Sequence, residues 1–225
     1  MPRGFFVTGT DTGVGKTLVA CALLRALAST GRSVIGMKPV AAGSEEGRWA
    51  DVDALTGAGS VAAPANLVNL YAFEPAIAPH IAAASEGERI DIETIARAYE
   101  ELSRRAQIVV VEGVGGLLVP LNEQHTAADL ARRLALPVVL VVGMRLGCLN
   151  HALLTSAQIE AAGLRCAGWV ANCITRDMEQ LSANIDSLKD RLDFPLLGVV
   201  PFQRDPVPAR VAGLLSLDSL AEAEA

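Results

Sequence analysis

Apolar runs and amphipathic patterns alternate along this chain. Short stretches dominated by Val, Ile, Leu and Phe are typical of buried strands, whereas apolar positions that recur every three or four residues are typical of helices. The runs predict strands at Phe5–Thr8, Ser33–Lys38, Val68–Phe73, Gln107–Glu112, Val138–Val142, Cys166–Asn172 and Leu196–Val200. The helical patterns predict helices at Lys16–Ala28, Ala50–Thr56, Ile92–Arg105, Thr126–Leu134, Asn150–Ala162 and Met178–Leu192.

The strand patterns are continuous apolar runs, which indicates burial on both faces. Such strands belong to mostly parallel sheets with helices on both sides, and the alternation of strand and helix favours the same α/β arrangement. We therefore expect a doubly wound, mostly parallel sheet, with residues 1–225 in a single domain. In these folds ligands bind at the carboxyl ends of the strands. Polar side chains that follow strand ends are therefore the first candidates for function.

Composition narrows the classes of partner. The net charge of −6 argues against nucleic acid, which normally requires a basic face. No apolar run approaches the length of a membrane span, and the N-terminal residues lack the pattern of a signal peptide. The four cysteines show no metal-binding spacing and are expected to be free thiols. We expect a cytoplasmic protein that binds small molecules, with no nucleic-acid and no membrane partner.

The segment Gly9–Thr17, GTDTGVGKT, follows an apolar strand and opens a helix, which is the context of a phosphate-binding loop. Gly13 and Gly15 permit positive φ, so that backbone N–H groups and the helix N-terminus can face an anion. Lys16 can reach the β- and γ-phosphates, and the Thr17 hydroxyl can bind Mg²⁺. Five residues rather than the usual four separate Gly9 from Gly15. The motif predicts a P-loop NTPase-like fold that binds a nucleoside triphosphate.

Acidic and basic side chains follow other strands and one predicted helix start. Glu112 ends an apolar strand and is followed by glycines, so it is the expected second Mg²⁺ contact, although an ordinary strand-end turn would look similar. Asp53 is a weaker candidate for a third oxygen ligand, and Asp51 is the expected helix cap. Lys38 ends the second strand and is placed to stabilise a transferring phosphoryl group or a carboxylated intermediate, unless it is simply a solvated lysine.

Two further segments are candidates for binding. Asn172 ends a strand, and its amide carries the donor and acceptor needed to read a base edge, with Pro201 and Phe202 placed to wall the base. The Leu146–His151 segment, LGCLNH, begins a helix after a strand, so its N–H groups offer a second anion site. A plain N-terminal helical turn explains the same pattern.

Taken together, GTDTGVGKT, KPVAAGS (Lys38–Ser44), VEGVGG (Val111–Gly116), LGCLNHALLT (Leu146–Thr155) and GWVAN (Gly168–Asn172) resemble the dethiobiotin synthetases of biotin biosynthesis, with order and spacing kept from about Phe5 to Phe202. The resemblance implies a homodimeric, Mg²⁺-dependent enzyme with ATP as co-substrate. It would close a ureido ring on 7,8-diaminopelargonic acid with CO₂, through a carbamate and a carbamic–phosphoric anhydride, and release ADP and phosphate.

The resemblance also implies roles for individual residues. The catalytic residues would be Lys38 and Lys16, and the metal ligands would be Thr17, Asp53 and Glu112. Nucleotide contacts would come from Thr12, Gly13, Val14, Gly15, Lys16, Thr17, Leu18, Asp53, Glu112, Gly113, Val114, Gly115, Asn172, Cys173, Pro201, Phe202 and Gln203. Substrate contacts would come from Lys38, Ala42, Leu146, Gly147, Cys148, Leu149 and Asn150, with the last five acting in the neighbouring subunit's site.

Ala42 departs from the family pattern, which usually has a hydroxyl residue that contacts the substrate at this position. Alanine donates no hydrogen bond, and the lost bond is worth ~0.5–1.5 kcal/mol unless another group replaces it. Ser44 or a backbone N–H is the expected replacement.

Two other classes of nucleotide-binding protein share parts of this pattern. Nucleotide-driven switch ATPases of the partitioning and targeting type carry an extra lysine early in the loop, where this chain has Asp11 and Thr12. The amidating enzymes of cobalamin biosynthesis carry an added glutaminase domain, for which 225 residues leave no room. Both patterns fit this sequence less well than the ring-closing ligase.

Overall fold

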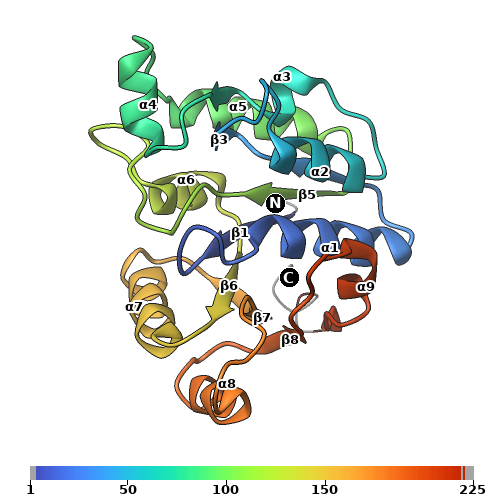
Figure 1. Cartoon of the computed structure of the whole chain (residues 1–225). Helices are drawn as coiled ribbons and strands as arrows, with labels where there is room; N and C mark the ends of the chain where they lie inside the picture. The colour runs from blue at the N-terminus through green and yellow to red at the C-terminus, as the bar shows by residue number, and fades with distance from the viewer. Residues whose placement is uncertain (1–3, 219, 221–225) are drawn as a thin grey trace.

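The computed structural model describes residues 4–218 and 220, and its centre is a six-stranded sheet (Figure 1). The spatial order is β2 (Val34–Met37), β5 (Ile108–Glu112), β1 (Gly4–Gly9), β6 (Val138–Met144), β7 (Cys166–Cys173) and β8 (Leu196–Val200). Every neighbouring pair in this sheet is parallel. The predicted doubly wound parallel sheet is therefore confirmed. All of the predicted strands lie in this sheet except the one over Val68–Phe73.

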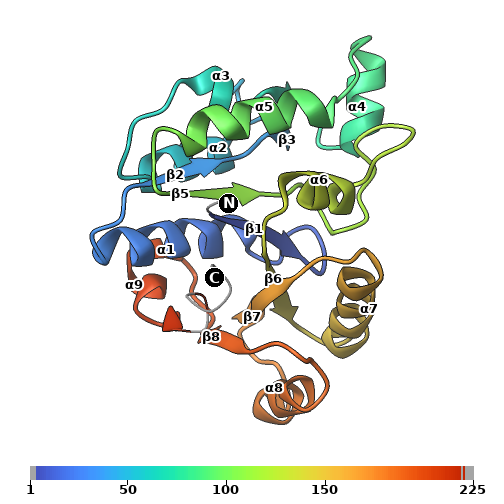
Figure 2. The ribbon, with the colours of Figure 1, turned by 180° about the vertical axis from the view of Figure 1, so that it is seen from behind.

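Helices cover both faces of the sheet. One face carries α1 (Lys16–Ser29), α2 (Ala50–Ala58) and α9 (Pro208–Ala212). The other face carries α3 (Ala65–Val68), α5 (Ile92–Ser103), α6 (Ala127–Leu134), α7 (Cys148–Ala161) and α8 (Leu181–Lys189). Figure 2, seen from behind, shows α7 and α9 on opposite sides of β7 and β8. Among the described residues, no helix is both long and apolar enough to cross a lipid bilayer.

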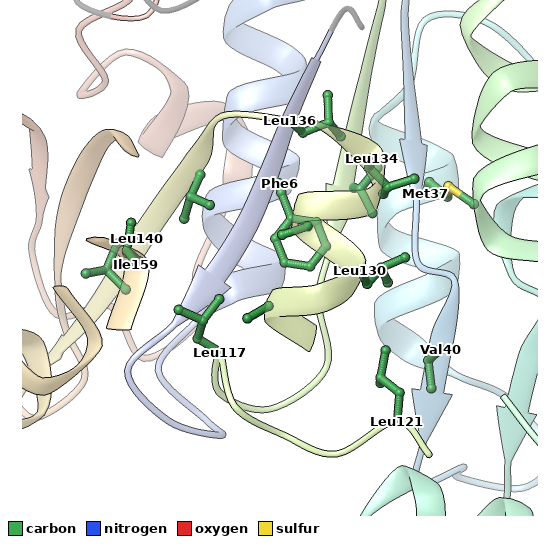
Figure 3. Packing of buried hydrophobic residues seen from close by; sticks show 14 of the residues in the cluster. Phe6, Met37, Val40, Leu117, Leu121, Leu130, Leu134, Leu136, Leu140 and Ile159 are labelled. Carbon is green, nitrogen blue, oxygen red and sulfur yellow. The ribbon is translucent and has the colours of Figure 1, made fainter. Parts of the chain in front are cut away.

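The alternation of side chains along β1 divides the core into two clusters. Phe5 and Val7 pack with the apolar residues of α1, whereas Phe6 points to the opposite face. Phe6 belongs to a cluster with Leu130 of α6 and Met37 of β2, and Figure 3 shows these side chains close together. With both faces of β1 buried, the loop that follows it is anchored at the centre of the sheet.

A second, two-stranded parallel sheet lies beyond β2 and was not predicted. It pairs β3 (Val40–Ala42) with β4 (Tyr71–Phe73), and α4 (Pro79–Ser85) follows. The prediction of one strand over Val68–Phe73 was wrong in its first half, because α3 ends at Val68. The Asn69 side chain donates to the carbonyl oxygens of Lys38 at 2.7 Å and Tyr71 at 3.3 Å, which makes a turn there.

Helix ends follow local capping. Thr126 and Asp129 form the predicted start of α6 as a capping box, each side chain accepting from the other residue's backbone N–H. The helix predicted over Met178–Leu192 is shorter, because Gln180 has a φ of 53° and α8 begins only after it. The helix predicted from Asn150 begins earlier, directly after Gly147, which has a φ of 93°.

Candidate functional site

The phosphate loop spans the end of β1 and the start of α1, as the motif predicted. Gly15 occupies the N-cap of α1 with a φ of 90°, a left-handed conformation that favours glycine. A Cβ at Gly15 would lie only 2.1 Å from the amide nitrogen of Asn172, so a larger residue would collide there. The first N–H groups of α1 therefore face the carboxyl edge of the sheet, where an anion would bind.

Lys16 is buried at the start of α1, and its Nζ donates to the carbonyl oxygen of Asp11 at 3.0 Å. Burial, followed by the positive charge of Lys38, lowers the pKa of Lys16 to about 8. The Lys16 ammonium is thus held inside the loop by one carbonyl oxygen. An arriving phosphate would provide the negative partner that this side chain lacks.

Glu112 joins the phosphate loop to Lys38. Its Oε1 accepts from the Thr17 hydroxyl at 2.9 Å and from the Lys38 Nζ at 2.6 Å, and Lys38 also donates to the Gly113 carbonyl oxygen at 3.2 Å. Lys38 is 4% exposed and Glu112 is 1% exposed. Burial alone would lower the pKa of Lys38, but the negative charges of Glu112 and Asp51 raise it overall, so the lysine stays charged.

Asp51, and not Asp53, completes this cluster. The Asp51 Oδ2 lies 3.0 Å from the Lys38 Nζ, whereas Asp53 is more than half exposed and pairs with Arg48 at 2.7 Å. Asp51 is therefore a candidate oxygen ligand that the sequence did not single out, while Asp53 as a metal ligand stays a prediction. Asp51 is not the helix cap, because Trp49 holds the N-cap position of α2 without a side-chain cap bond. Of the two acids on the first turn of α2, Asp51 is the one that pairs with Lys38.

The donor set beside the loop fits Mg²⁺. Glu112 Oε2 is fully buried and has no hydrogen-bond partner, so one carboxylate oxygen is left for a cation. The Thr17 hydroxyl and the Asp51 carboxylate supply two more oxygen ligands of the kind that Mg²⁺ prefers. No group of three or more His, Cys, Asp or Glu side chains suited to a metal occurs among the described residues. Phosphate oxygens and water would therefore have to complete the shell.

A pocket of about 290 Å³ lies on the far side of the phosphate loop. Of the predicted nucleotide contacts, Gly13, Gly15, Leu18, Asn172, Cys173, Pro201, Phe202 and Gln203 line it, and Ile174, Arg204 and Pro206 lie there without having been predicted. Asn172 is buried and donates its amide to the Val14 carbonyl oxygen at 2.8 Å. The Asn172 amide nitrogen thus braces the phosphate loop, which leaves the side-chain oxygen to accept from a base.

The glycine-rich segment after β5 borders a second pocket, of about 410 Å³. Its walls come from the start of the phosphate loop, the segment after β5 and α7, namely Thr10–Thr12, Gly116–Pro120, Leu154, Thr155 and Gln158. The Gly113 N–H donates to the Val7 carbonyl oxygen of β1, and Val114 and Gly115 follow it in the chain toward this pocket. The segment thus links the Lys38 cluster to the open space beside the loop.

The predicted substrate residues are spread over two places. Ala42 ends β3, and the N–H groups of Gly43 and Ser44 already donate to the carbonyl oxygens of Phe73 and Glu74. These two backbone N–H groups therefore cannot replace the missing hydroxyl, and the Ser44 side chain remains the expected replacement. The Leu146–Asn150 turn lies at the start of α7, with Cys148 buried and Leu146 98% exposed.

An ion pair of the phosphate loop was also not predicted. Arg145, directly before that turn, donates to the Asp11 carboxylate at 2.7 Å. The two residues lie 134 positions apart, and the only signal in the sequence is that both follow neighbouring strands, β1 and β6.

The fold and these side chains define a class, a P-loop nucleotide-binding protein with a buried lysine–carboxylate cluster beside the loop. Residues 3–210 match the family described as an AAA domain. The chain is 52% identical over 217 residues to the ATP-dependent dethiobiotin synthetase BioD of Nitrosospira multiformis, with 96% of each chain covered. It is 52% identical over 220 residues to the enzyme of that name from Aromatoleum aromaticum, with 96% of this chain and 98% of the relative covered. The chain belongs to the family of ATP-dependent dethiobiotin synthetases, which are ligases.

Solved structures with lower identity share the fold. The septum site-determining protein MinD of Pyrococcus horikoshii, complexed with Mg-ADP, aligns with a TM-score of 0.55 at 19% identity, with 100% of this chain and 91% of that chain covered. A ParA family ATPase of Chlorobium tepidum aligns with a TM-score of 0.54 at 12% identity and the same coverage. At these identities the likeness supports the fold alone and does not favour a switch ATPase.

Proposed function

We propose that this protein is a cytoplasmic, Mg²⁺-dependent ligase that closes the ureido ring of dethiobiotin on 7,8-diaminopelargonic acid, using CO₂ and ATP. One observation carries the proposal. This chain, which is 52% identical to a dethiobiotin synthetase, has a buried, charged lysine beside the phosphate loop, and the Nζ of this Lys38 lies 2.6 Å from Glu112 Oε1. Such a site can neutralise negative charge that develops during phosphoryl transfer.

The reaction divides into three steps. One amine of the diamine adds to CO₂ and loses a proton, which gives a carbamate. A carbamate oxygen then attacks the γ-phosphorus of ATP and ADP leaves, which gives a carbamic–phosphoric anhydride. The second amine attacks the carbamoyl carbon and loses a proton, the C–O bond breaks, and phosphate leaves with the bridging oxygen as the ring closes. Each step needs positioned partners and stabilised negative charge more than covalent help from the protein.

The residues of the chain supply that positioning and charge. The N–H groups of Gly13 to Thr17 bind the phosphates, and Lys16 exchanges the Asp11 carbonyl oxygen for the phosphate oxygens. Lys38 stabilises the carbamate and the transferring phosphoryl group, because it stays protonated and lies beside the loop. Asn172 holds the loop at Val14 and accepts from the adenine, while Pro201 and Phe202 wall the base.

Mg²⁺ would be held by Thr17, Glu112 and Asp51 together with phosphate oxygens, and it would supply positive charge to the triphosphate. With a cation present, the Glu112 carboxylate has a second positive partner. Lys38 then needs to neutralise less of that carboxylate's charge.

A homodimer with shared sites is part of the proposal. Large apolar side chains are exposed around α7, including Leu146, Leu154 and Leu118, and such patches mark surfaces that meet a partner. In the dimer, the Leu146–Asn150 turn of one protomer accepts the substrate carboxylate in its partner's site. Leu154→Glu should then yield a monomer with little activity, as sedimentation and turnover together would reveal. A fully active monomer would contradict shared sites.

The test of the proposed function is ATP turnover with diaminopelargonic acid and bicarbonate present together, each omitted in turn, and both omitted. We expect ADP and dethiobiotin to form in equal amounts only when both are present. ATP hydrolysis that ignores both compounds would contradict the proposal and would favour a switch-type ATPase.

A further inference from the structure

Asp11 poses an electrostatic problem for the phosphate loop. It is a carboxylate within the Gly9–Thr17 segment, whose proposed task is to bind a highly charged anion. A negative charge at such a place repels the ligand unless another group neutralises it or turns it away. The surroundings of Asp11 therefore bear on how well this loop can bind a nucleotide.

The structure gives each oxygen of the Asp11 carboxylate a hydrogen-bond donor. Oδ1 accepts the N–H of Thr12 at 2.7 Å, and Oδ2 accepts from the Arg145 guanidinium at 2.7 Å. The Asp11 carbonyl oxygen, pointing elsewhere, accepts from Lys16 at 3.0 Å. Asp11 thus holds Lys16 through its carbonyl oxygen, and its side chain carries the only negative charge within Gly9–Thr17.

Arg145 comes from a neighbouring strand end. It follows β6, which pairs with β1, and the backbone of Thr10 donates to Val141 of β6 at 3.0 Å. Its carbonyl oxygen accepts from the Cys148 N–H at 3.0 Å, which closes the turn at the start of α7. The Asp11–Arg145 pair therefore ties the phosphate loop to the turn that follows β6.

We propose that Arg145 is a positioning residue for the nucleotide, which neutralises Asp11 and holds the first half of the phosphate loop in its binding conformation. This inference rests on the proposed nucleotide site and does not depend on the ring-closing reaction. Both partners are a little under half exposed, so the pair contributes little to the stability of the fold. Its contribution is to the charge that an incoming phosphate meets.

The experiment measures dissociation constants of the full-length protein for AMP, ADP and a non-hydrolysable ATP analogue at low salt. Arg145→Met should weaken binding of the ATP analogue about tenfold and of AMP much less, because repulsion by Asp11 grows with ligand charge. Arg145→Lys keeps the charge and should stay within about threefold of the wild type. Thermal stability should be unchanged within error in both variants.

The decisive test is to remove the negative charge of Asp11 in the Arg145→Met variant. Asp11→Asn in the Arg145→Met background keeps the acceptor for the Thr12 N–H and should restore affinity for the ATP analogue to within about threefold of the wild type. The matched control is Arg133→Met, which breaks a similarly half-exposed ion pair with Glu93 between α6 and α5 and should leave every affinity unchanged.

Three results would overturn the inference. They are an unchanged affinity of Arg145→Met for the ATP analogue, an equal loss for AMP and the analogue, and no restoration by Asp11→Asn. If the wild type binds nucleotides but makes no dethiobiotin, the proposed reaction fails and the inference on Arg145 stands. If the wild type binds no nucleotide, both fail.

Discussion

Two sets of ion pairs lie near the start of α2, and they differ in their surroundings. Lys38, which is 4% exposed, pairs with Glu112 at 1% and Asp51 at 31%, whereas Arg48 pairs with Asp53 on the surface, with exposed fractions of 78% and 54%. The contact distances are similar, between 2.6 and 3.0 Å. Distance alone therefore does not distinguish the pair beside the phosphate loop from the pair on the surface.

Burial is what separates them. A charge in a low-dielectric interior interacts strongly with its partner and is costly to leave alone, while an exposed pair is screened and contributes little. The buried pair also meets the phosphate loop through the Thr17 hydroxyl, and the exposed pair does not. Of the two aspartates at the start of α2, only Asp51 therefore lies where it can act on the lysine beside the loop.

The largest expected effect is that of Lys38→Met. We expect turnover to fall at least about a hundredfold while nucleotide binding is retained, because a charge that stabilises the transition state is lost. The variant should also lose ~3–5 kcal/mol of stability, since Glu112 remains buried without that partner. Turnover, ADP affinity and thermal denaturation measure the three effects.

Arg48→Met is the matched control for the exposed pair. It should change stability by at most ~1 kcal/mol and leave turnover as it was. Similar losses in the two variants would break the comparison, and unchanged turnover in Lys38→Met would remove Lys38 from the mechanism.

The next effect separates the two aspartates. Asp51→Asn should raise the Mg²⁺ concentration needed for half-maximal turnover about tenfold, because one anionic oxygen ligand is lost. Asp53→Asn changes the same residue type two positions away and should behave like the wild type. Titrations of turnover against Mg²⁺ for both variants decide the point, and the reverse result would identify Asp53 as the ligand.

A pH dependence follows from the buried lysine of the loop. Lys16, with a pKa of about 8, is charged at pH 7 and mostly neutral at pH 9, so it must take up a proton to pair with phosphate. We expect metal-free ADP affinity to be level below pH 8 and to fall up to about tenfold per pH unit above it. Calorimetry should detect proton uptake there. In Lys16→Met, binding is weaker and this slope should vanish, whereas a slope that persists would assign the titration to another group.

The smallest expected effect is a gain in apparent affinity for the diamine substrate. Ala42→Ser restores a hydroxyl at the end of β3, and it should lower the KM for diaminopelargonic acid about two- to tenfold, equivalent to ~0.5–1.5 kcal/mol. Ser44→Ala tests the expected replacement and should raise that KM by a similar factor. If neither variant moves the KM, this end of β3 does not contact the substrate.

Much of the fold could be predicted because strands and long helices carry periodic patterns. Fully apolar strands such as Ile108–Val111 and the capping box at Thr126 are local signals, and the structure contains both. The short sheet of β3 and β4 has no such signal, because its register depends on Asn69 reaching the Lys38 carbonyl oxygen. Contacts of that kind depend on the folded chain rather than on the local sequence.

The site shows the same division. The phosphate loop, Lys38 and Glu112 follow strand ends, so their convergence could be predicted from the topology. That Asp51 rather than Asp53 pairs with Lys38 could not be predicted, because the pairing depends on how α2 is rotated against the sheet, and the local sequence does not specify that rotation. The Asp11–Arg145 pair joins loops that are 134 residues apart in the sequence, so it could not be predicted either.

In the proposed reaction, the γ-phosphoryl group of ATP is transferred to a carboxylated diamine rather than to water. Brief turnover with ¹⁸O-labelled CO₂, stopped before the label exchanges with solvent, tests it most directly. Because the carbamate oxygen attacks phosphorus and leaves with phosphate, we predict one labelled oxygen in each phosphate and one in the ureido carbonyl of each dethiobiotin. Phosphate without the label would mean that water accepts the phosphoryl group, and it would contradict the account.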